Sequence, residues 1–147
     1  MTGVSERGGW GTPRDLWRLL RAAPAGSCLV DPDGDPLTPR RIEAAALHLA
    51  RRLEPLLAGQ RAAIVVLPAT PGAVVTLFAL WSRGRMAIPV DPLHGPGAIA
   101  TAAALTGART LLTSRRYIAR AGFEPLLSRV DTTVEIVDLE RIQGSGG

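Results

Sequence analysis

The stretch from Arg61 to Leu93 restricts the possible folds of this chain more than any other part of the sequence. Residues 64–67 form a short apolar run rich in β-branched side chains, which is typical of a strand buried on both faces. Residues 70–71 then supply a threonine N-cap and a proline for the first helical turn, and Gly84 follows the apolar helical pattern as a stop signal. Residues 86–90 form a second buried strand. A strand, a helix and a strand in this order predict a βαβ unit with parallel strands and a right-handed crossover.

The rest of the chain continues this alternation of helices and strands. The expected helices are 15–23, 39–58, 71–84, 96–106 and 114–122, with one further turn at 126–127, and the expected strands of the main sheet are 62–67, 86–90, 109–113 and 133–137. Residues 27–30 and 36–37 are expected to pair as two further strands around a turn at 31–35. Pro55 is expected to kink helix 39–58 or to end it early. The alternation predicts the α/β class: a three-layer sandwich with a mostly parallel sheet of at least three strands, on which helices 39–58 and 71–84 pack.

The composition changes mainly at the two ends of the chain. Residues 1–12 are rich in glycine and are expected to be a disordered tail, residues 13–142 to be one α/β domain, and residues 143–147 to be a flexible end. The last strand, 133–137, would then have no element after it to cover its edge. We therefore expect the isolated chain to expose apolar surface there, and either to self-associate or to need the remainder of a larger protein as its partner.

Charge and cysteine content narrow the functional classes. The net charge is +4 and the sequence pI is about 10.9, but the chain has no lysine and its arginines are scattered. Aromatic residues make up only 4% of the chain, too few for a base-stacking platform, so nucleic-acid binding is not expected. No apolar stretch reaches about 18 residues without a charge or a proline, and the N-terminus lacks the apolar core of a secretory signal, so neither a membrane span nor secretion is expected. The single cysteine, Cys28, cannot form an internal disulfide, which favours a cytoplasmic location.

The acidic segment 31–35 has the composition of a cation-binding loop. An EF-hand needs a glycine at loop position six and a carboxylate at position twelve, and these positions hold Pro36 and Ile42. Aspartate and glycine are also the residues that a tight turn between strands requires, so a turn is the preferred interpretation. The two histidines have no cysteine at a ligand spacing, and no metal site is expected.

Three residues are candidates for nucleophilic or acid–base chemistry. Cys28 could be a nucleophile with His48 or His94 as its base. Cys28 lies on an expected strand, however, and is interpreted as a small buried hydrophobic residue. His48 is interpreted as a solvated or boundary residue of a helix. His94 follows the carboxyl end of a parallel strand, where ligands of open α/β sheets bind, but an ordinary loop histidine is the preferred interpretation.

Two arginine pairs could bind an anion or support a helix end. Residues 113–116 lie where a strand leads into a helix, so backbone N–H groups and two arginines could hold a phosphate. The preferred interpretation is an N-cap at Ser114 followed by solvent-facing arginines. Arg83 and Arg85 flank Gly84 and are interpreted as structural complements of a helix C-terminus. A phosphate loop of the P-loop type requires a lysine and is therefore impossible here.

Several short motifs occur in a characteristic order. They are the segment 31–38, the turn 67–70, the residues Gly84, Pro89, Asp91 and Pro92 around the second strand, and the segments 107–117 and 134–140. In this order and spacing, residues 27–142 resemble the adenylate-forming (AMP-dependent) acyl synthetase and ligase family. The last two segments are similar to its acyl-carrier-protein synthetase and lysophospholipid acyltransferase branch. Two positions depart from the family pattern: Ala69 replaces the usual asparagine and Pro39 the usual tyrosine.

This resemblance implies the N-terminal α/β subdomain of a bacterial AMP-forming ligase, of the fatty-acyl-CoA or acyl-carrier-protein type. The family's ATP loop and catalytic lysine lie downstream of the matched region, so the chain is expected to be a non-catalytic portion that shows no carboxylate-dependent ATP–pyrophosphate exchange. No catalytic, cofactor-binding or metal-binding residue is assigned, and ATP and Mg²⁺ are expected only for the complete enzyme. The alternative is a freestanding α/β module that binds a nucleotide or a protein without catalysis.

Overall fold

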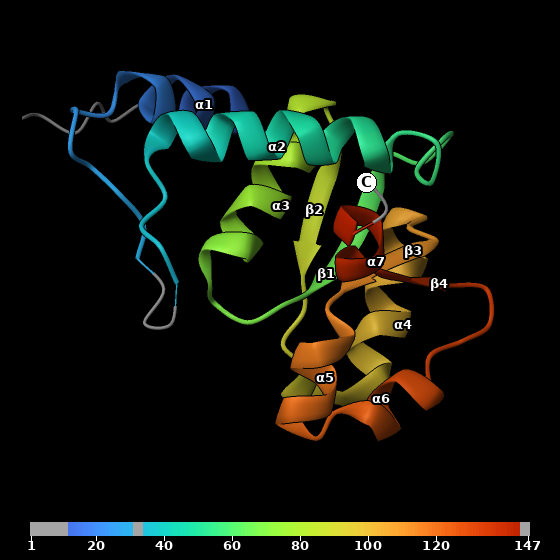
Figure 1. Ribbon diagram of the computed structural model, residues 1–147. Helices are drawn as coiled ribbons and strands as arrows, with labels where there is room; N and C mark the ends of the chain where they lie inside the picture. The colour runs from blue at the N-terminus through green and yellow to red at the C-terminus, as the bar shows by residue number, and fades with distance from the viewer. Residues whose placement is uncertain (1–11, 31–33, 145–147) are drawn as a thin grey trace, which may run out of the picture.

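The computed structural model describes residues 12–30 and 34–144, which fold around a four-stranded sheet (Figure 1). The strands are β1 (Ala62–Val66), β2 (Met86–Pro89), β3 (Thr110–Thr113) and β4 (Glu135–Asp138), in the order β2-β1-β3-β4. Every neighbouring pair is parallel, and Ile64 of β1 lies opposite Ile88 of β2 and Leu111 of β3. The predicted parallel sheet is therefore confirmed, with all four expected strands in it. The prediction that 86–90 is buried was wrong, since β2 lies at the edge of the sheet and exposes Met86 and Pro89.

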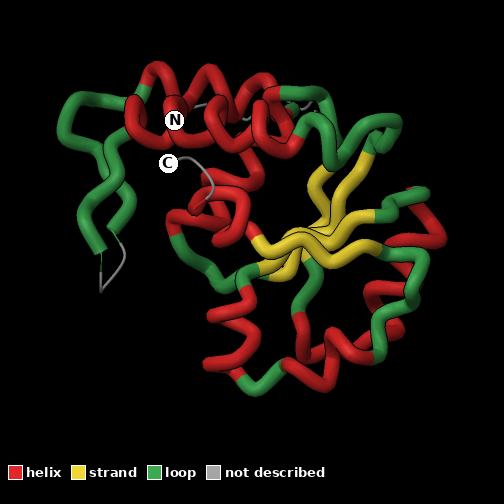
Figure 2. The backbone as a smooth tube through the Cα atoms, turned by 45° about the vertical axis from the view of Figure 1, so that its right-hand side comes forward, coloured by secondary structure: helices red, strands yellow, loops and turns green. Residues whose placement is uncertain are grey.

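Helices cover both faces of this sheet (Figure 2). One face carries α1 (Pro13–Ala22), α2 (Pro39–Leu53), α3 (Pro71–Ser82) and α7 (Leu139–Gly144), and the other carries α4 (Gly95–Thr106), α5 (Arg115–Ala121) and α6 (Glu124–Ser128). Successive strand side chains point to opposite faces, so Ala63 and Val65 join the first core whereas Ile64 and Val66 join the second. All five residues of β1 are buried, as the continuous apolar run predicts. The architecture is the expected three-layer α/β sandwich.

The helix boundaries follow from local chemistry. Thr38 caps α2, because its hydroxyl accepts a hydrogen bond from the Arg41 amide at 3.3 Å. The helix ends at Leu53 rather than at residue 58, since Pro55 lacks an N–H and its ring excludes a continuing helix. Thr70 occupies the N-cap position of α3, but its side chain makes no capping hydrogen bond, which corrects the predicted role of this threonine.

Two predictions at the N-terminal side were wrong. Thr12 was assigned to a tail, but it forms a capping box with Asp15 and begins α1; residues 1–11 lie outside the described part of the chain. The two strands expected at 27–30 and 36–37 are reduced to one antiparallel bridge between Leu29 and Leu37. The turn residues 31–33 also lie outside the described residues.

The C-terminal side ends in a helix that the sequence analysis did not predict. Residues 143–144 belong to α7 and not to a flexible end, whereas 145–147 lie outside the described residues. Leu139 of α7 is only 5% exposed and packs in the same core as Val137 of β4. The segment 133–137, expected to lack cover, is therefore followed by a helix packed on one face of the sheet, and Val134 is buried on the other.

Candidate functional site

The chain connections identify one position at the carboxyl ends of the central strands as a candidate binding site. From β1 the chain passes through α3 to β2, and α3 packs in the core of the first face. From β3 it passes through α5 and α6 to β4, and these helices pack in the core of the second face. The two connections leave neighbouring strands toward opposite faces and opposite edges of the sheet. In open α/β sheets, ligands bind outside the carboxyl ends of the strands at such a switch point.

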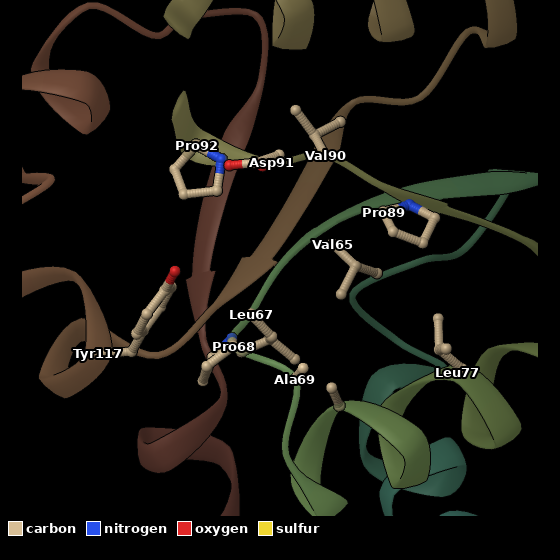
Figure 3. Close-up of a pocket in the computed structure, with 11 residues that line it drawn as sticks. Val65, Leu67, Pro68, Ala69, Leu77, Pro89, Val90, Asp91, Pro92 and Tyr117 are labelled. Atoms are coloured by element: carbon tan, nitrogen blue, oxygen red, sulfur yellow. The ribbon is translucent and has the colours of Figure 1, made fainter. Parts of the chain in front are cut away.

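A pocket of about 480 Å³ lies beside this switch point, over the carboxyl ends of β1 and β2 (Figure 3). Its lining residues come from the ends of β1 and β2, from α3 and from α5; they are Val65, Leu67, Pro68, Ala69, Ala73, Leu77, Pro89, Val90, Asp91, Pro92 and Tyr117. The turn after β1 forms one wall and the segment after β2 forms another, so the parallel register brings two distant parts of the sequence together. Tyr117 reaches the pocket because β3 places α5 beside β1.

The walls of the pocket are mainly apolar, and its lining carries only two titratable side chains. One is Asp91, whose Oδ1 accepts a hydrogen bond from the Leu93 amide at 2.9 Å. The other is Tyr117, whose oxygen points toward Pro92 and Asp91 in Figure 3 and makes no hydrogen bond with any other described residue. No lysine, arginine or histidine lines the pocket. The pocket can therefore surround an uncharged group, but it offers no cation for a phosphate or a carboxylate.

The predicted phosphate-binding alternative at residues 113–116 is disfavoured by the geometry. Ser114 caps α5 by accepting a hydrogen bond from the Tyr117 amide at 3.1 Å, and its hydroxyl donates to Glu140. The Arg115 amide donates to Asp138 Oδ1 at 3.3 Å. Two carboxylates thus occupy the donors that a phosphate would need, and their charge repels an anion. The N-cap interpretation is confirmed.

The nucleophile candidates are not brought into a catalytic arrangement. Cys28 is exposed, contrary to the predicted buried position, because the expected strand around it is reduced to a single bridge. His48 is exposed on α2, and His94 is exposed at the end of the short 3-10 helix Pro92–His94, just beyond the pocket. Within the described residues no hydrogen bond links Cys28 to either histidine, and no group of three potential metal ligands occurs.

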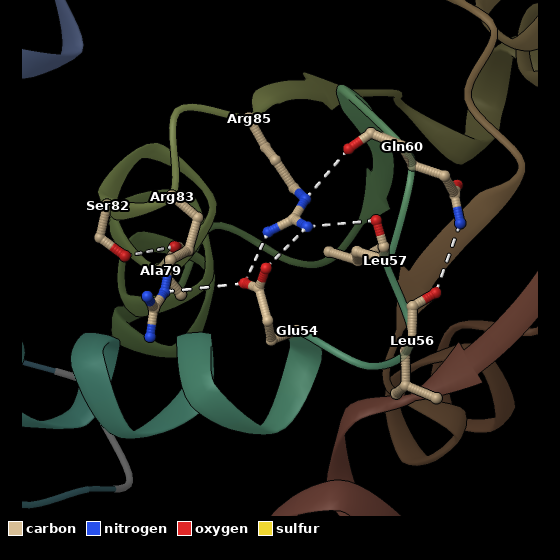
Figure 4. A network of polar contacts seen from close by, with 8 residues as sticks. All are labelled: Glu54, Leu56, Leu57, Gln60, Ala79, Ser82, Arg83 and Arg85. Atoms are coloured by element: carbon tan, nitrogen blue, oxygen red, sulfur yellow. Dashed lines mark hydrogen bonds and ion pairs between the residues drawn. The ribbon is translucent and has the colours of Figure 1, made fainter.

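Arg83 and Arg85 are structural, but they contact Glu54 and the segment after α2 rather than the C-terminal carbonyls of a helix, as the sequence predicted (Figure 4). The Arg85 guanidinium donates to both carboxylate oxygens of Glu54, at 2.9 and 3.2 Å. It also donates to the carbonyl oxygens of Gln60 and Leu57, at 3.1 and 3.2 Å. Arg83 makes a longer contact with Glu54, at 3.7 Å. These arginines therefore fasten the segment after α2 to the turn before β2.

The pocket itself was not identified by sequence reasoning. Leu67 and Pro68 were interpreted as part of the turn motif 67–70, Asp91 as part of the motif around the second strand, and Tyr117 as the end of the motif 107–117. The available signal was positional: Leu67 and Pro68 follow β1, Asp91 follows β2, and Tyr117 lies in the first turn of the helix after β3. No helix in the described part of the chain is long and apolar enough to cross a membrane.

Comparison with solved structures identifies the fold. VinN in complex with 3-methylaspartate superposes with a TM-score of 0.69 at 17% identity, over 91% of this chain and 36% of VinN. The N-terminal subdomain of Klebsiella oxytoca NpsA, in complex with 3-hydroxybenzoyl-AMSN, gives 0.69 at 15% identity, over 92% and 32%. O-succinylbenzoate coenzyme A synthetase (MenE) from Bacillus subtilis, in complex with AMP, gives 0.67 at 16% identity, over 89% and 33%. The chain spans about a third of the length of these proteins and has the fold of their N-terminal subdomain.

Sequence comparison gives the family. No curated protein sequence matches the chain. The family model of the AMP-binding enzymes matches residues 17–145. This range includes all four strands and every described helix, except that the first four residues of α1 lie outside it. This chain therefore belongs to the AMP-binding enzyme family.

Proposed function

We propose that this chain is the N-terminal, non-catalytic portion of an AMP-forming acyl synthetase. Such an enzyme activates a carboxylate with ATP, giving an acyl-adenylate and pyrophosphate, and then transfers the acyl group to a thiol. The observation that carries the proposal is the family match over residues 17–145. The chain spans about a third of the length of its structural neighbours.

The described residues do not fit the phosphates of ATP. Stabilising phosphate charge requires positioned cations and free backbone donors. The pocket lining has no cation, and carboxylates occupy the donors at Ser114 and Arg115. In our proposal ATP and Mg²⁺ therefore bind only in the complete enzyme, and this chain contributes part of the sheet and one wall of the cleft.

The more specific assignment rests on the sequence motifs. Residues 107–117 and 134–140 support the acyl-carrier-protein synthetase and lysophospholipid acyltransferase branch, and hence a fatty-acyl substrate with coenzyme A or a carrier protein as the thiol. The single cysteine supports a cytoplasmic setting. The partner in this proposal is the remainder of the ligase.

ATP–pyrophosphate exchange tests the proposal. The purified chain is assayed alone, and again with the product of the adjoining coding sequence that carries a lysine-containing, Ser/Thr/Gly-rich ATP loop. We expect no carboxylate-dependent exchange from the chain alone and clear exchange from the mixture. Exchange by the chain alone would contradict the non-catalytic assignment. A mixture without exchange, in which the chain nevertheless binds a nucleotide or another protein, would favour the freestanding binding module.

A further inference from the structure

We infer that a second pocket, at the amino ends of β3 and β4, binds a small zwitterion such as an α-amino acid with an apolar side chain. Its lining comes from α4, from residues 107–109 before β3 and from residues 131–134 before β4, and we call it the α4 pocket. It lies at the opposite ends of the strands from the pocket over β1 and β2. The inference therefore goes beyond the proposed function and does not depend on it.

The α4 pocket is an open hollow over an apolar floor. Its volume, about 400 Å³, falls within the range of about 300–1,000 Å³ that ligand pockets commonly have. Ala100 and Ala104 of the lining are exposed, and a Cβ added at Gly107 would meet no atom within 4 Å. Ile99 and Val134 form the floor and are only 1% and 6% exposed. The space therefore suits a short hydrocarbon group, which gains free energy by covering this apolar surface.

Two opposite charges line the α4 pocket and do not neutralise each other. Arg109 supplies a guanidinium and Asp131 a carboxylate, and neither forms an ion pair with a described residue. A guanidinium binds a carboxylate, often through two parallel hydrogen bonds, and a carboxylate binds an ammonium group. A ligand with one charge would satisfy one of these groups and meet a like charge at the other. A zwitterion satisfies both groups at once.

The backbone holds Arg109 on the face of the sheet that α4 covers. The Arg109 amide donates to Gln60 Oε1 at 3.1 Å, and the Arg109 carbonyl oxygen accepts from the Glu135 amide at 2.8 Å. Leu111, two residues later, packs in the same core as Ile99 of α4. Side chains two residues apart in an extended segment point to the same face, so the guanidinium is directed to the side on which the α4 pocket lies.

The turn before β4 fixes Asp131 and keeps it ionised. Its Oδ1 accepts a hydrogen bond from the Thr133 amide at 2.8 Å, and its carbonyl oxygen accepts from the Val134 amide at 2.9 Å. Hydrogen bonds from the Thr133 backbone and side chain lower the pKa of Asp131 below its ordinary value, so the carboxylate is charged at neutral pH. Because the backbones of Asp131 and Arg109 are ordered before a ligand arrives, little entropy is lost on binding.

Titration of the purified chain with three matched probes, followed by two-dimensional amide NMR, tests the inference. L-valine carries both charges on a small apolar group, isobutyrate carries only the carboxylate, and isobutylamine carries only the ammonium. We expect L-valine to shift the amides of residues 103–109 and 131–134 saturably, with a Kd on the order of 1 mM for so small a ligand. Each singly charged probe should bind at least about tenfold more weakly than L-valine.

Four variants sharpen the test. Ala104→Trp fills the α4 pocket from an exposed position and should weaken L-valine binding at least about tenfold. Ala44→Trp is the matched control, since Ala44 is an exposed alanine on α2 outside the α4 pocket, and it should leave binding unchanged. Arg109→Gln should reduce the advantage of L-valine over isobutylamine. Asp131→Asn, which keeps an oxygen for the Thr133 amide, should reduce the advantage of L-valine over isobutyrate.

The inference would be overturned by absence of saturable shifts with L-valine, by equal or tighter binding of either singly charged probe, or by insensitivity to Ala104→Trp. Unchanged probe preferences in both charge variants would also reject it. A dispersed amide spectrum, recorded before each titration, establishes that a variant is folded, so that a loss of binding is not a loss of the fold. These outcomes are independent of ATP–pyrophosphate exchange, so the α4 pocket and the proposed function can each fail alone.

Discussion

At the scale of single residues, Arg85 makes the densest set of polar contacts described in this chain. Its side chain is 10% exposed and bonds to Glu54, Leu57 and Gln60 together. The Gln60 side chain continues this network by accepting hydrogen bonds from the Arg109 amide and the Thr110 hydroxyl, at 3.1 and 3.0 Å. Residues before β1, β2 and β3 are thus held together at the amino ends of the strands, opposite the pocket at the carboxyl ends of β1 and β2. These contacts stabilise the strand register on which the walls of that pocket depend.

The titration of Glu54 should make this network dependent on pH. Hydrogen bonds from Arg85 lower the pKa of Glu54 below its ordinary value, the charges of Arg85 and Arg83 lower it further, and partial desolvation opposes them. Because the folded pKa is lowered, the stabilisation is present above the unfolded pKa of about 4.3 and is lost as the pH falls through the folded pKa. Glu54→Gln should therefore lower the midpoint of urea unfolding at pH 7, and the difference from the parent chain should shrink toward zero as the pH falls through the folded pKa of Glu54. Glu135→Gln is the control, because Glu135 is exposed and forms no ion pair with another described residue. If the difference in midpoint between Glu54→Gln and the parent chain does not change with pH, this account is contradicted.

At the scale of helices and strands, the elements with local signals were predictable. The β-branched run of β1 and the Thr38–Pro39 start of α2 gave the right element type because burial and capping are encoded within a few residues. Cys28 was misplaced because a strand at 27–30 needs a partner, and only the Leu29–Leu37 bridge forms. The pocket was not predictable from periodicity, since Leu67, Asp91 and Tyr117 meet only through the order of the strands.

Helix α7 was also not predictable, because its position depends on contacts with distant residues, and its contribution to stability can be tested. It is too short for a periodic pattern, and its position depends on Leu139 entering the core and on Asp138 accepting the Arg115 and Glu140 amides at 3.3 and 3.2 Å. Leu139→Ala should cost about 2–4 kcal/mol in the free energy of unfolding, as for other buried leucines. Arg141→Ala on the exposed side of the helix should change it by less than about 0.5 kcal/mol. Urea unfolding of both variants measures the difference; equal, small effects would show that α7 is not part of the stable core.

At the scale of the whole molecule, the sheet has two edge strands with different surroundings. Each is paired on one side only, but β4 carries the carboxylates of Glu135 and Asp138, whereas β2 has no charged side chain and carries Met86, which is 58% exposed. Several other large apolar side chains are also exposed, among them Leu93 and Leu105, at 79% and 81%. Exposed apolar surface of this kind is typical of sites that contact another polypeptide.

The isolated chain should consequently self-associate through the β2 edge. Unpaired N–H and C=O groups along an edge strand bind another strand, and a charged side chain on the edge prevents this. We expect light scattering at tens of micromolar to show species larger than a monomer for the parent chain, and a shift toward the monomer for Met86→Lys. Leu105→Lys adds the same charge at an even more exposed apolar position on α4, away from the edge, and should have the smaller effect. If both variants dissociate the oligomer equally, general apolar contact rather than strand pairing drives the association. A parent chain that stays monomeric with a cooperative melt would instead favour the freestanding module.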